Sequence, residues 1–218
     1  MEVWILVNNR AGRQHARENG EQVRRVFALG GARARVAYTD TVEEGAAFLQ
    51  QAVEAQPDLL VCCGGDGTLS QALNVLQQLD AKLPLGYVPM GTTNDFAASL
   101  GLPKEPAKAA EQILHGQPRL LDLGRFGERE FLYVASFGAF TQSSYKAAPQ
   151  VKAVLGHLAY VLESAKELPF LRACSLQVDT GDALYEGEYL FGAVSNPLSV
   201  GGILKLDPPA VHLSLIHI

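Results

Sequence analysis

Hydrophobic and polar residues follow two alternating patterns through the first half of the chain. Between short apolar runs, apolar residues recur every three or four positions, which is the spacing of an amphipathic helix. The runs predict strands at residues 3–7, 33–38, 59–63 and 85–89. The segments between and after them predict helices at residues 14–29 and 42–55, one after residue 68, a short one ending at residue 100, and one at 106–115. Strands that alternate with helices predict a parallel sheet of the α/β class.

The pattern changes after residue 118. Strand signals follow at residues 119–126, 130–137, 172–178 and 184–194, with one long helical segment at 150–168. Cys174, Leu176 and Val178 alternate with polar residues, so that strand has one solvated face and belongs to an antiparallel sheet. We therefore predict two domains, an α/β domain at residues 1–118 and a β-rich, antiparallel sandwich-like domain at residues 119–218.

Glycine-rich loops follow the third and fourth predicted strands. They are Gly64-Gly65-Asp66-Gly67-Thr68 and Gly91-Thr92-Thr93-Asn94-Asp95. The carboxyl ends of parallel strands meet at one edge of a sheet, so both loops should line one cleft. Glycine lets a ligand approach the backbone, and the first N–H groups of the following helix attract anions. The first domain is therefore expected to be a Rossmann-like, nucleotide-binding domain.

Asp66 is out of place in a loop that only binds an anion. A carboxylate repels phosphate unless a cation or a transferable proton lies between them, which indicates Mg²⁺ and nucleotide chemistry. The loop lacks the lysine of a P-loop, and residues 65–70 depart from the dinucleotide fingerprint at its last glycine. A tight strand-to-helix turn without a ligand is the alternative for a single loop of this kind, and the second loop argues against it.

Composition excludes several classes of function. A formal net charge of -5 argues against a nucleic-acid partner, because polyanion binding normally requires a basic surface. No apolar run reaches the roughly 18–20 residues that a membrane-spanning helix needs. Three cysteines, two of them adjacent in a predicted strand, give neither a disulfide framework nor metal-ligand spacing. These features are typical of a protein of the reducing cytoplasm.

The two loops also form an ordered pair of motifs. Gly64–Thr68 precedes a helical segment that contains Asn74, and the second loop lies within Pro89-Met90-Gly91-Thr92-Thr93-Asn94-Asp95-Phe96-Ala97. This pair resembles the GGDGT and P-x-G-T-x-N-D-F-A motifs of the diacylglycerol kinase catalytic-domain family, which includes bacterial lipid kinases and the sphingosine and ceramide kinases. The resemblance covers nearly the whole chain. NAD kinases and phosphofructokinases share a GGDG-type loop without the second motif, so they are the alternative enzyme class.

The resemblance implies an ATP-dependent lipid kinase of phospholipid metabolism, which transfers the γ-phosphoryl group of ATP to a lipid hydroxyl such as that of diacylglycerol. It implies ATP and Mg²⁺ as cofactors. The ATP-binding positions that it implies are Asn8, Thr39, Gly64, Gly65, Gly67, Thr68, Gly91 and Thr92. Asp66 is the implied catalytic residue, acting with Mg²⁺ or as proton acceptor, and no residue is assigned as a structural metal ligand. Asn94 and Asp95 either order the second loop as a helix cap or line the acceptor side.

Two of these positions rest on partial matches to the family. Its N-P-x-S-G motif is met only at the first and last residues of Asn8-Asn9-Arg10-Ala11-Gly12. Thr39 resembles a nucleotide-binding threonine of the family, although Thr41 lies close enough to take that position. Thr41 and Glu44 also form a capping box at the start of a predicted helix, so helix capping is the alternative for Thr41.

The match to the family ends near the carboxyl terminus. Residues 201–210 resemble its G-G-G-x-K-x-x-P-x-A motif, whereas Ser214-Leu215 stands where the family has Asp-Gly. We therefore expect an incomplete second domain, with a truncation or frame change after Ala210. The alternative functions are a catalytically incompetent fragment that binds ATP and a purely structural α/β domain.

A lipid substrate implies transient contact with a membrane surface, so the expected location is cytoplasmic and peripheral at the membrane. The expected partners are ATP and a lipid alcohol, without nucleic acid. The identity of the acceptor lipid and the oligomeric state do not follow from these motifs.

Overall fold

Two compact units make up the computed structural model, which describes residues 1–11, 15–127, 129–138, 173–180, 183–195, 199–200 and 204–205. The first unit comprises Met1–Tyr133 and Asn196–Lys205, and the second comprises Val134–Ser195 and Leu206–Ile218. Residues 119–133, which the sequence pattern placed in the second domain, group with the first unit. The predicted helix at 150–168 and the expected altered end at 211–218 lie outside the described residues, as does most of the 201–210 motif.

A four-stranded parallel sheet in the order β2-β1-β3-β4 forms the centre of the first unit. Its strands are β1 (Glu2–Asn8), β2 (Arg33–Thr39), β3 (Leu59–Gly64) and β4 (Leu85–Pro89). The helices of this unit are α1 (Ala16–Leu29), α2 (Val42–Ala55), α3 (Asp66–Gln78), α4 (Asp95–Ser99) and α5 (Pro106–His115). This arrangement confirms the predicted α/β class with a parallel sheet.

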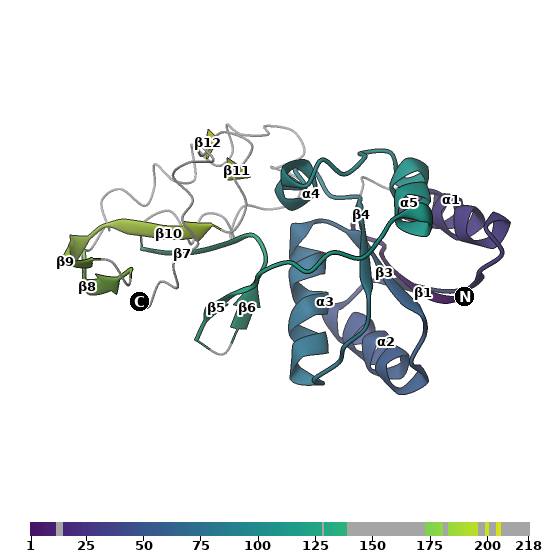
Figure 1. Cartoon of the computed structure of the whole chain (residues 1–218), viewed down its shortest axis with the longest axis horizontal. Helices are drawn as coiled ribbons and strands as arrows, with labels where there is room; N and C mark the ends of the chain where they lie inside the picture. The colour runs from purple at the N-terminus through teal and green to yellow at the C-terminus, as the bar shows by residue number, and fades with distance from the viewer. Residues whose placement is uncertain are drawn as a thin grey trace. The chain divides into compact units, whose positions relative to one another are not determined.

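The sheet is buried on both faces, which explains why its strands are continuous apolar runs. Val3, Ile5 and Val7 of β1 belong to the core cluster that includes residues of α1 and α5. Trp4 and Leu6 point the other way, into the cluster formed with α2 and α3. In Figure 1, α1 and α5 accordingly lie on one side of the sheet, and α2 and α3 lie on the other.

Strand β3 carries the two adjacent cysteines at the centre of this sheet. Cys62 belongs to the core cluster on the α2 and α3 side, and Cys63 belongs to the cluster on the α1 and α5 side. Both thiols are fully buried and free. Burial raises the pKa of Cys62 to about 12, and burial likewise raises the pKa of Cys63. The adjacent pair is therefore part of the packing of the sheet, as the strand prediction required.

The expected capping box at the start of α2 is present. The Glu44 N–H donates to Thr41 Oγ1 at 3.2 Å, and the Thr41 N–H donates to Glu44 Oε2 at 3.3 Å. At the other end, Gln56 adopts a left-handed conformation just before Pro57, which cannot continue the helix. The helix therefore spans residues 42–55, the same bounds that the sequence predicted.

The strand predictions after residue 118 were partly wrong. The structure has β5 (Gly124–Phe126) and β6 (Arg129–Phe131) as an antiparallel pair, followed by β7 (Val134–Gly138). Residues 119–123 form no strand, and Leu120, Leu121 and Leu123 are exposed. Apolar composition alone does not make a strand where no neighbouring strand supplies hydrogen bonds. The single predicted strand at 130–137 is likewise divided, at Leu132 and Tyr133.

The described strands of the second unit pair in the antiparallel sense, as expected. β8 (Cys174–Asp179) pairs with β9 (Leu184–Tyr189), and β10 (Phe191–Ser195) pairs with β7. The predicted strand at 184–194 is therefore two strands, separated at Leu190. A further short antiparallel pair, β11 (Ser199–Val200) with β12 (Leu204–Lys205), belongs to the first unit.

Among the described residues, we find no helix whose length and hydropathy would let it cross a membrane.

The capping box allows a direct test of what fixes the start of α2. Replacing Thr41 by Ala removes the acceptor of the Glu44 N–H, and we expect the free energy of unfolding to fall by about 1 kcal/mol. Thr41→Ser keeps the hydroxyl and should lose only a few tenths of a kcal/mol. Urea unfolding followed by circular dichroism measures both variants. Equal losses for Ala and Ser would show that the hydroxyl does not stabilise the helix.

Candidate functional site

The carboxyl ends of the four parallel strands bring most of the sequence-predicted residues to one edge of the sheet. Thr39 at the end of β2 pairs in register with Asn8 at the end of β1. On the other side of β1, Gly64 ends β3 and pairs with Pro89 at the end of β4. Both glycine-rich loops leave the sheet here, at the shared edge that the predicted parallel sheet implied.

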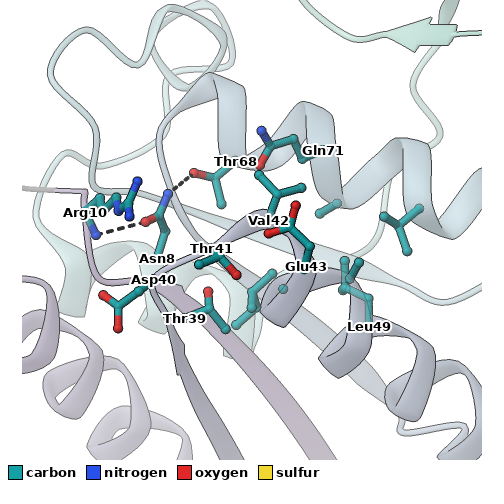
Figure 2. Close-up of a pocket in the computed structure, with 15 residues that line it drawn as sticks. Asn8, Arg10, Thr39, Asp40, Thr41, Val42, Glu43, Leu49, Thr68 and Gln71 are labelled. Carbon is teal, nitrogen blue, oxygen red and sulfur yellow. Dashed lines mark hydrogen bonds between the residues drawn. The ribbon is translucent and has the colours of Figure 1, made fainter. Parts of the chain in front are cut away.

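A pocket of about 390 Å³ lies at this edge, and Figure 2 shows the side chains that line it. This volume falls within the range of small-molecule binding sites. Its polar wall includes the predicted Asn8, Thr39 and Thr68, together with Arg10 and Gln71. The remaining lining residues come mainly from the start of α2 and from apolar positions of α2, α3 and β1: Leu6, Asp40, Thr41, Val42, Glu43, Gly45, Ala46, Leu49, Ala72 and Val75.

Asn8 links β1 to the first turn of α3. Its Nδ2 donates to Thr68 Oγ1 at 2.8 Å, and its Oδ1 accepts from the Arg10 N–H at 2.9 Å (Figure 2). Because Thr68 accepts this bond, its own O–H proton can be donated to a ligand in the pocket. The two residues therefore form a prearranged polar pair on the wall of the pocket.

Thr39 and Thr41 both line the pocket but are held differently. Thr39 is buried, and its hydroxyl donates to the Val7 carbonyl oxygen at 3.4 Å. Thr41 is exposed, and its hydroxyl oxygen caps α2. The geometry thus assigns Thr41 the capping role that was the alternative for it.

The amino ends of α2 and α3 differ in one respect that matters for ligand binding. The N-cap residue of α3 is Gly65, and no side chain caps this end of the helix. The first N–H groups of α3 are therefore not satisfied by a capping side chain, unlike those of α2. Unsatisfied N–H groups and the helix dipole together favour an anion at this position.

The two glycine loops are in direct backbone contact. A Cβ added at Gly91 would lie 2.6 Å from Gly65 Cα, and one added at Gly64 would lie 2.6 Å from Thr68 Oγ1. The Met90 N–H also donates to the Gly64 carbonyl oxygen at 2.7 Å. A side chain at Gly91 would therefore force the two loops apart, whereas one at Gly64 would displace the Thr68 side chain of its own loop. By contrast, a Cβ at the exposed Gly67 would meet no atom within 4 Å.

Asn94 closes the second loop on itself. Its Oδ1 accepts from the Gly91 N–H at 2.9 Å, and its Nδ2 donates to the Gly91 carbonyl oxygen at 2.8 Å. The residue adopts a left-handed backbone with φ of 53°, which asparagine tolerates better than most residues. These contacts support a role in ordering the loop. Thr92, in the same loop, is exposed.

Asp66 joins the two loops. Its Oδ2 accepts from the Asp95 N–H at 2.9 Å, and its Oδ1 accepts from the Phe96 N–H at 3.2 Å. The carboxylate thereby caps the amino end of α4. Burial raises the pKa of Asp66, an effect that the two N–H donors oppose and the nearby charge of Asp95 increases. A hydrogen bond from the Tyr87 hydroxyl also lowers the pKa of Asp66, and the carboxylate keeps lone pairs that these donors do not use.

Asp95 is nearly fully buried, with an exposed fraction of 5%. Its Oδ2 accepts a hydrogen bond from the Tyr133 hydroxyl at 2.7 Å. A second tyrosine, Tyr87 of β4, donates to the Gly64 carbonyl oxygen at 3.3 Å, and burial raises its pKa. Both tyrosines therefore hold the loops by hydrogen bonds, and neither tyrosine lines the pocket.

The structure thus divides the predicted site residues into two neighbouring groups. Asn8, Thr39 and Thr68 line the pocket, whereas the glycines, Asp66, Asn94 and Asp95 form the joined loops. The first turn of α3 belongs to both groups. Among the described residues, no group of three or more His, Cys, Asp or Glu side chains could hold a metal ion by itself.

Sequence reasoning missed several residues of the site. Gln71 follows Thr68 by three positions on a helix, so the i, i+3 spacing would have placed it on the same face. Arg10 lies two residues after Asn8, in the segment that matches the family motif only in part. Tyr87 and Tyr133 had no local signal, because their contacts depend on how separate segments fold together.

Comparison with known proteins places these features in context. The family model described as diacylglycerol kinase catalytic domain matches residues 2–126. The diacylglycerol kinase of Bacillus subtilis is 34% identical over 205 residues, which cover 94% of this chain and 68% of that protein. A diacylglycerol kinase of Staphylococcus epidermidis is 32% identical over 172 residues, or 79% of this chain and 54% of that protein. The chain therefore spans about half to two thirds of the length of these relatives.

The fold is also similar to solved structures. Two crystal structures from Bacillus anthracis match 95% of this chain with TM-scores of 0.77 and 0.72, at 25% and 24% sequence identity. They are covered over 68% and 70% of their own lengths, and the second is described as a diacylglycerol kinase.

The contact between the loops predicts how two glycine substitutions will differ. Gly91→Ala should lower the free energy of unfolding by about 1–3 kcal/mol, because its Cβ would overlap Gly65 Cα and approach Asn94 Oδ1. Gly67→Ala is the matched control, and it should leave stability unchanged or raised, since alanine favours the helix. Thermal and urea unfolding measure both. Equal destabilisation by the two substitutions would contradict the close contact of the loops.

Proposed function

Because the chain belongs to the diacylglycerol kinase catalytic-domain family, we propose that it is an ATP-dependent lipid kinase that transfers the γ-phosphoryl group of ATP to a lipid hydroxyl. The observation that carries the proposal is the first turn of α3, which has no capping side chain, begins with Asp66 and contributes Thr68 to the pocket. A diacylglycerol-like acceptor is the substrate that the names of the relatives suggest.

ATP would bind with its phosphates at the first turn of α3. The unsatisfied N–H groups and the hydroxyl of Thr68 would donate to phosphate oxygens, and Gly67 leaves the approach open. The nucleoside would occupy the pocket, whose polar wall contains Asn8 and Thr39. Gly91 and Thr92 of the second loop would approach from the other side.

Asp66 would stand at the reaction centre. Phosphoryl transfer depends mainly on positioning and charge neutralisation, and Mg²⁺ would supply neutralisation on the phosphoryl oxygens. One carboxylate together with substrate phosphates is a common way to hold Mg²⁺, and the free lone pairs of Asp66 fit this use. The same lone pairs could instead accept the proton of the lipid hydroxyl, which the raised pKa of Asp66 favours. The N–H groups of Asp95 and Phe96 would fix the carboxylate in either role.

The proposed acceptor sets where the reaction takes place. A lipid alcohol is delivered from a bilayer, so the protein would contact the membrane surface at least transiently, from the cytoplasmic side. ATP and the lipid alcohol would be its partners in the reaction.

The function is tested with the full-length protein, Mg²⁺, radiolabelled ATP and vesicles that contain diacylglycerol. We expect labelled phosphatidic acid, together with a melting temperature that Mg²⁺ and ATP raise, because a ligand of the native state stabilises it. ATP binding without labelled lipid, on vesicles that also offer other lipid alcohols, would favour the catalytically incompetent alternative. No stabilisation by any nucleotide would favour a purely structural domain.

Asp66→Asn tests the role of the carboxylate. We expect kcat to fall by about 100-fold or more, because the amide cannot replace a base or an anionic metal ligand. Isothermal calorimetry then separates the two roles. Loss of the Mg²⁺ dependence of ATP binding would indicate a metal ligand, whereas unchanged Mg²⁺ and ATP binding would indicate a proton acceptor. Normal turnover in the variant would contradict both.

A further inference from the structure

Asp95 needs a hydrogen-bond donor because it is a carboxylate at a buried position. Burying an anion without partners is costly, and the Tyr133 hydroxyl at 2.7 Å supplies a short, charge-assisted bond. The backbone N–H of the same residue donates to Asp66. A displacement of the Asp95 side chain would therefore also shift the Asp95 N–H and, with it, the Asp66 carboxylate that accepts from this N–H.

The strand that leads to Tyr133 is held by a side chain of α3. Asn74 Nδ2 donates to the Glu130 carbonyl oxygen at 2.9 Å, and the Glu130 N–H donates to Asn74 Oδ1 at 3.1 Å. Both polar groups of one residue of β6 are thus paired with a single amide, much as a neighbouring strand would pair them. Asn74 Nδ2 also donates to the Ser70 carbonyl oxygen at 2.8 Å, which fixes the side chain on its helix.

These contacts form a closed circuit that begins and ends on α3. From Asp66 it passes to Asp95, then to Tyr133, back along the chain to Glu130, and through Asn74 to α3 again. All five residues belong to the first unit. We call this circuit the Tyr133 ring. Each member of the ring is therefore held from two sides, by a hydrogen bond on one side and by a second bond or the chain itself on the other.

We propose that Tyr133 is a positioning residue for the phosphoryl-transfer step, which acts by holding Asp95 and through it Asp66, and that Asn74 anchors the segment that carries Tyr133. The inference rests on the proposed kinase function. Tyr133 and Asn74 both lie outside the glycine loops, and neither lines the pocket. ATP binding should therefore not depend on Tyr133, whereas turnover should.

A double-mutant cycle on kcat tests the inference in the full-length protein. Tyr133→Phe removes only one oxygen, and we expect kcat to fall about tenfold with the KM for ATP changed less than about twofold. In the Asp95→Ala background, where no side-chain oxygen remains to accept from the Tyr133 hydroxyl, the same change should cost less than about twofold. Asn74→Ala should likewise lower the kcat of the unaltered protein, but in the Tyr133→Phe variant it should cause little further loss of kcat.

Arg125→Gln is the matched control. Arg125 contacts the Glu130 side chain at 3.1 Å in the same hairpin but takes no part in the ring, so kcat should stay within about twofold. Assays well below each variant's melting temperature exclude loss through unfolding. The inference would be overturned if Tyr133→Phe lowered kcat tenfold in both backgrounds, or if it raised the KM for ATP in place of lowering kcat. Either result would leave the proposed kinase function standing. An unaltered protein that binds ATP but phosphorylates no lipid would defeat the proposed function, and the inference with it.

Discussion

The backbones of the two glycine loops touch, and the rest of the carboxyl edge depends on that contact. Strands β3 and β4 pair in parallel up to Gly64 and Pro89, so the loops leave the sheet side by side. Only residues without a side chain allow Gly65 and Gly91 to approach as they do. Once the loops are adjacent, the Asp66 carboxylate reaches the start of α4. The first turn of α3 and the Asp66 carboxylate are thereby positioned by the main-chain packing of the loops.

The two helices that face the pocket illustrate how one residue can change what a helix end does. Both α2 and α3 follow a parallel strand and point their amino ends toward the same edge. In α2, Thr41 satisfies an N–H group from within the chain. In α3, Gly65 leaves the corresponding groups without a capping side chain. The first end is stabilised by its own sequence, and the second is available to an external anion.

The sequence predicted the first unit more fully than the second half of the chain. The bounds of α2 and β4 were predicted correctly, because the capping box, Pro57 and short apolar runs are local signals. The edge that holds the site followed from the predicted parallel sheet, in which the carboxyl ends of the strands meet at one edge. The roles of Asp66 as a cap of α4 and of Tyr133 could not be predicted, since they require residues 29 and 38 positions apart to meet. Residues 119–123 were wrongly expected as strand, because apolar composition does not reveal whether a neighbouring strand exists.

The two adjacent, free cysteines of β3 can be used to detect opening of the central sheet. Cys62 and Cys63 face opposite layers, are fully buried and have raised pKa values, so the reactive thiolate is scarce on either side of the sheet. Cys174, in the second unit, is exposed. An alkylating reagent would therefore mark the second unit at once, while the first unit would be marked only when its central strand separates from its neighbours. The labelling rate of Cys62 and Cys63 therefore reports on the opening of the first unit, and the exposed Cys174 gives the rate of a thiol that needs no opening.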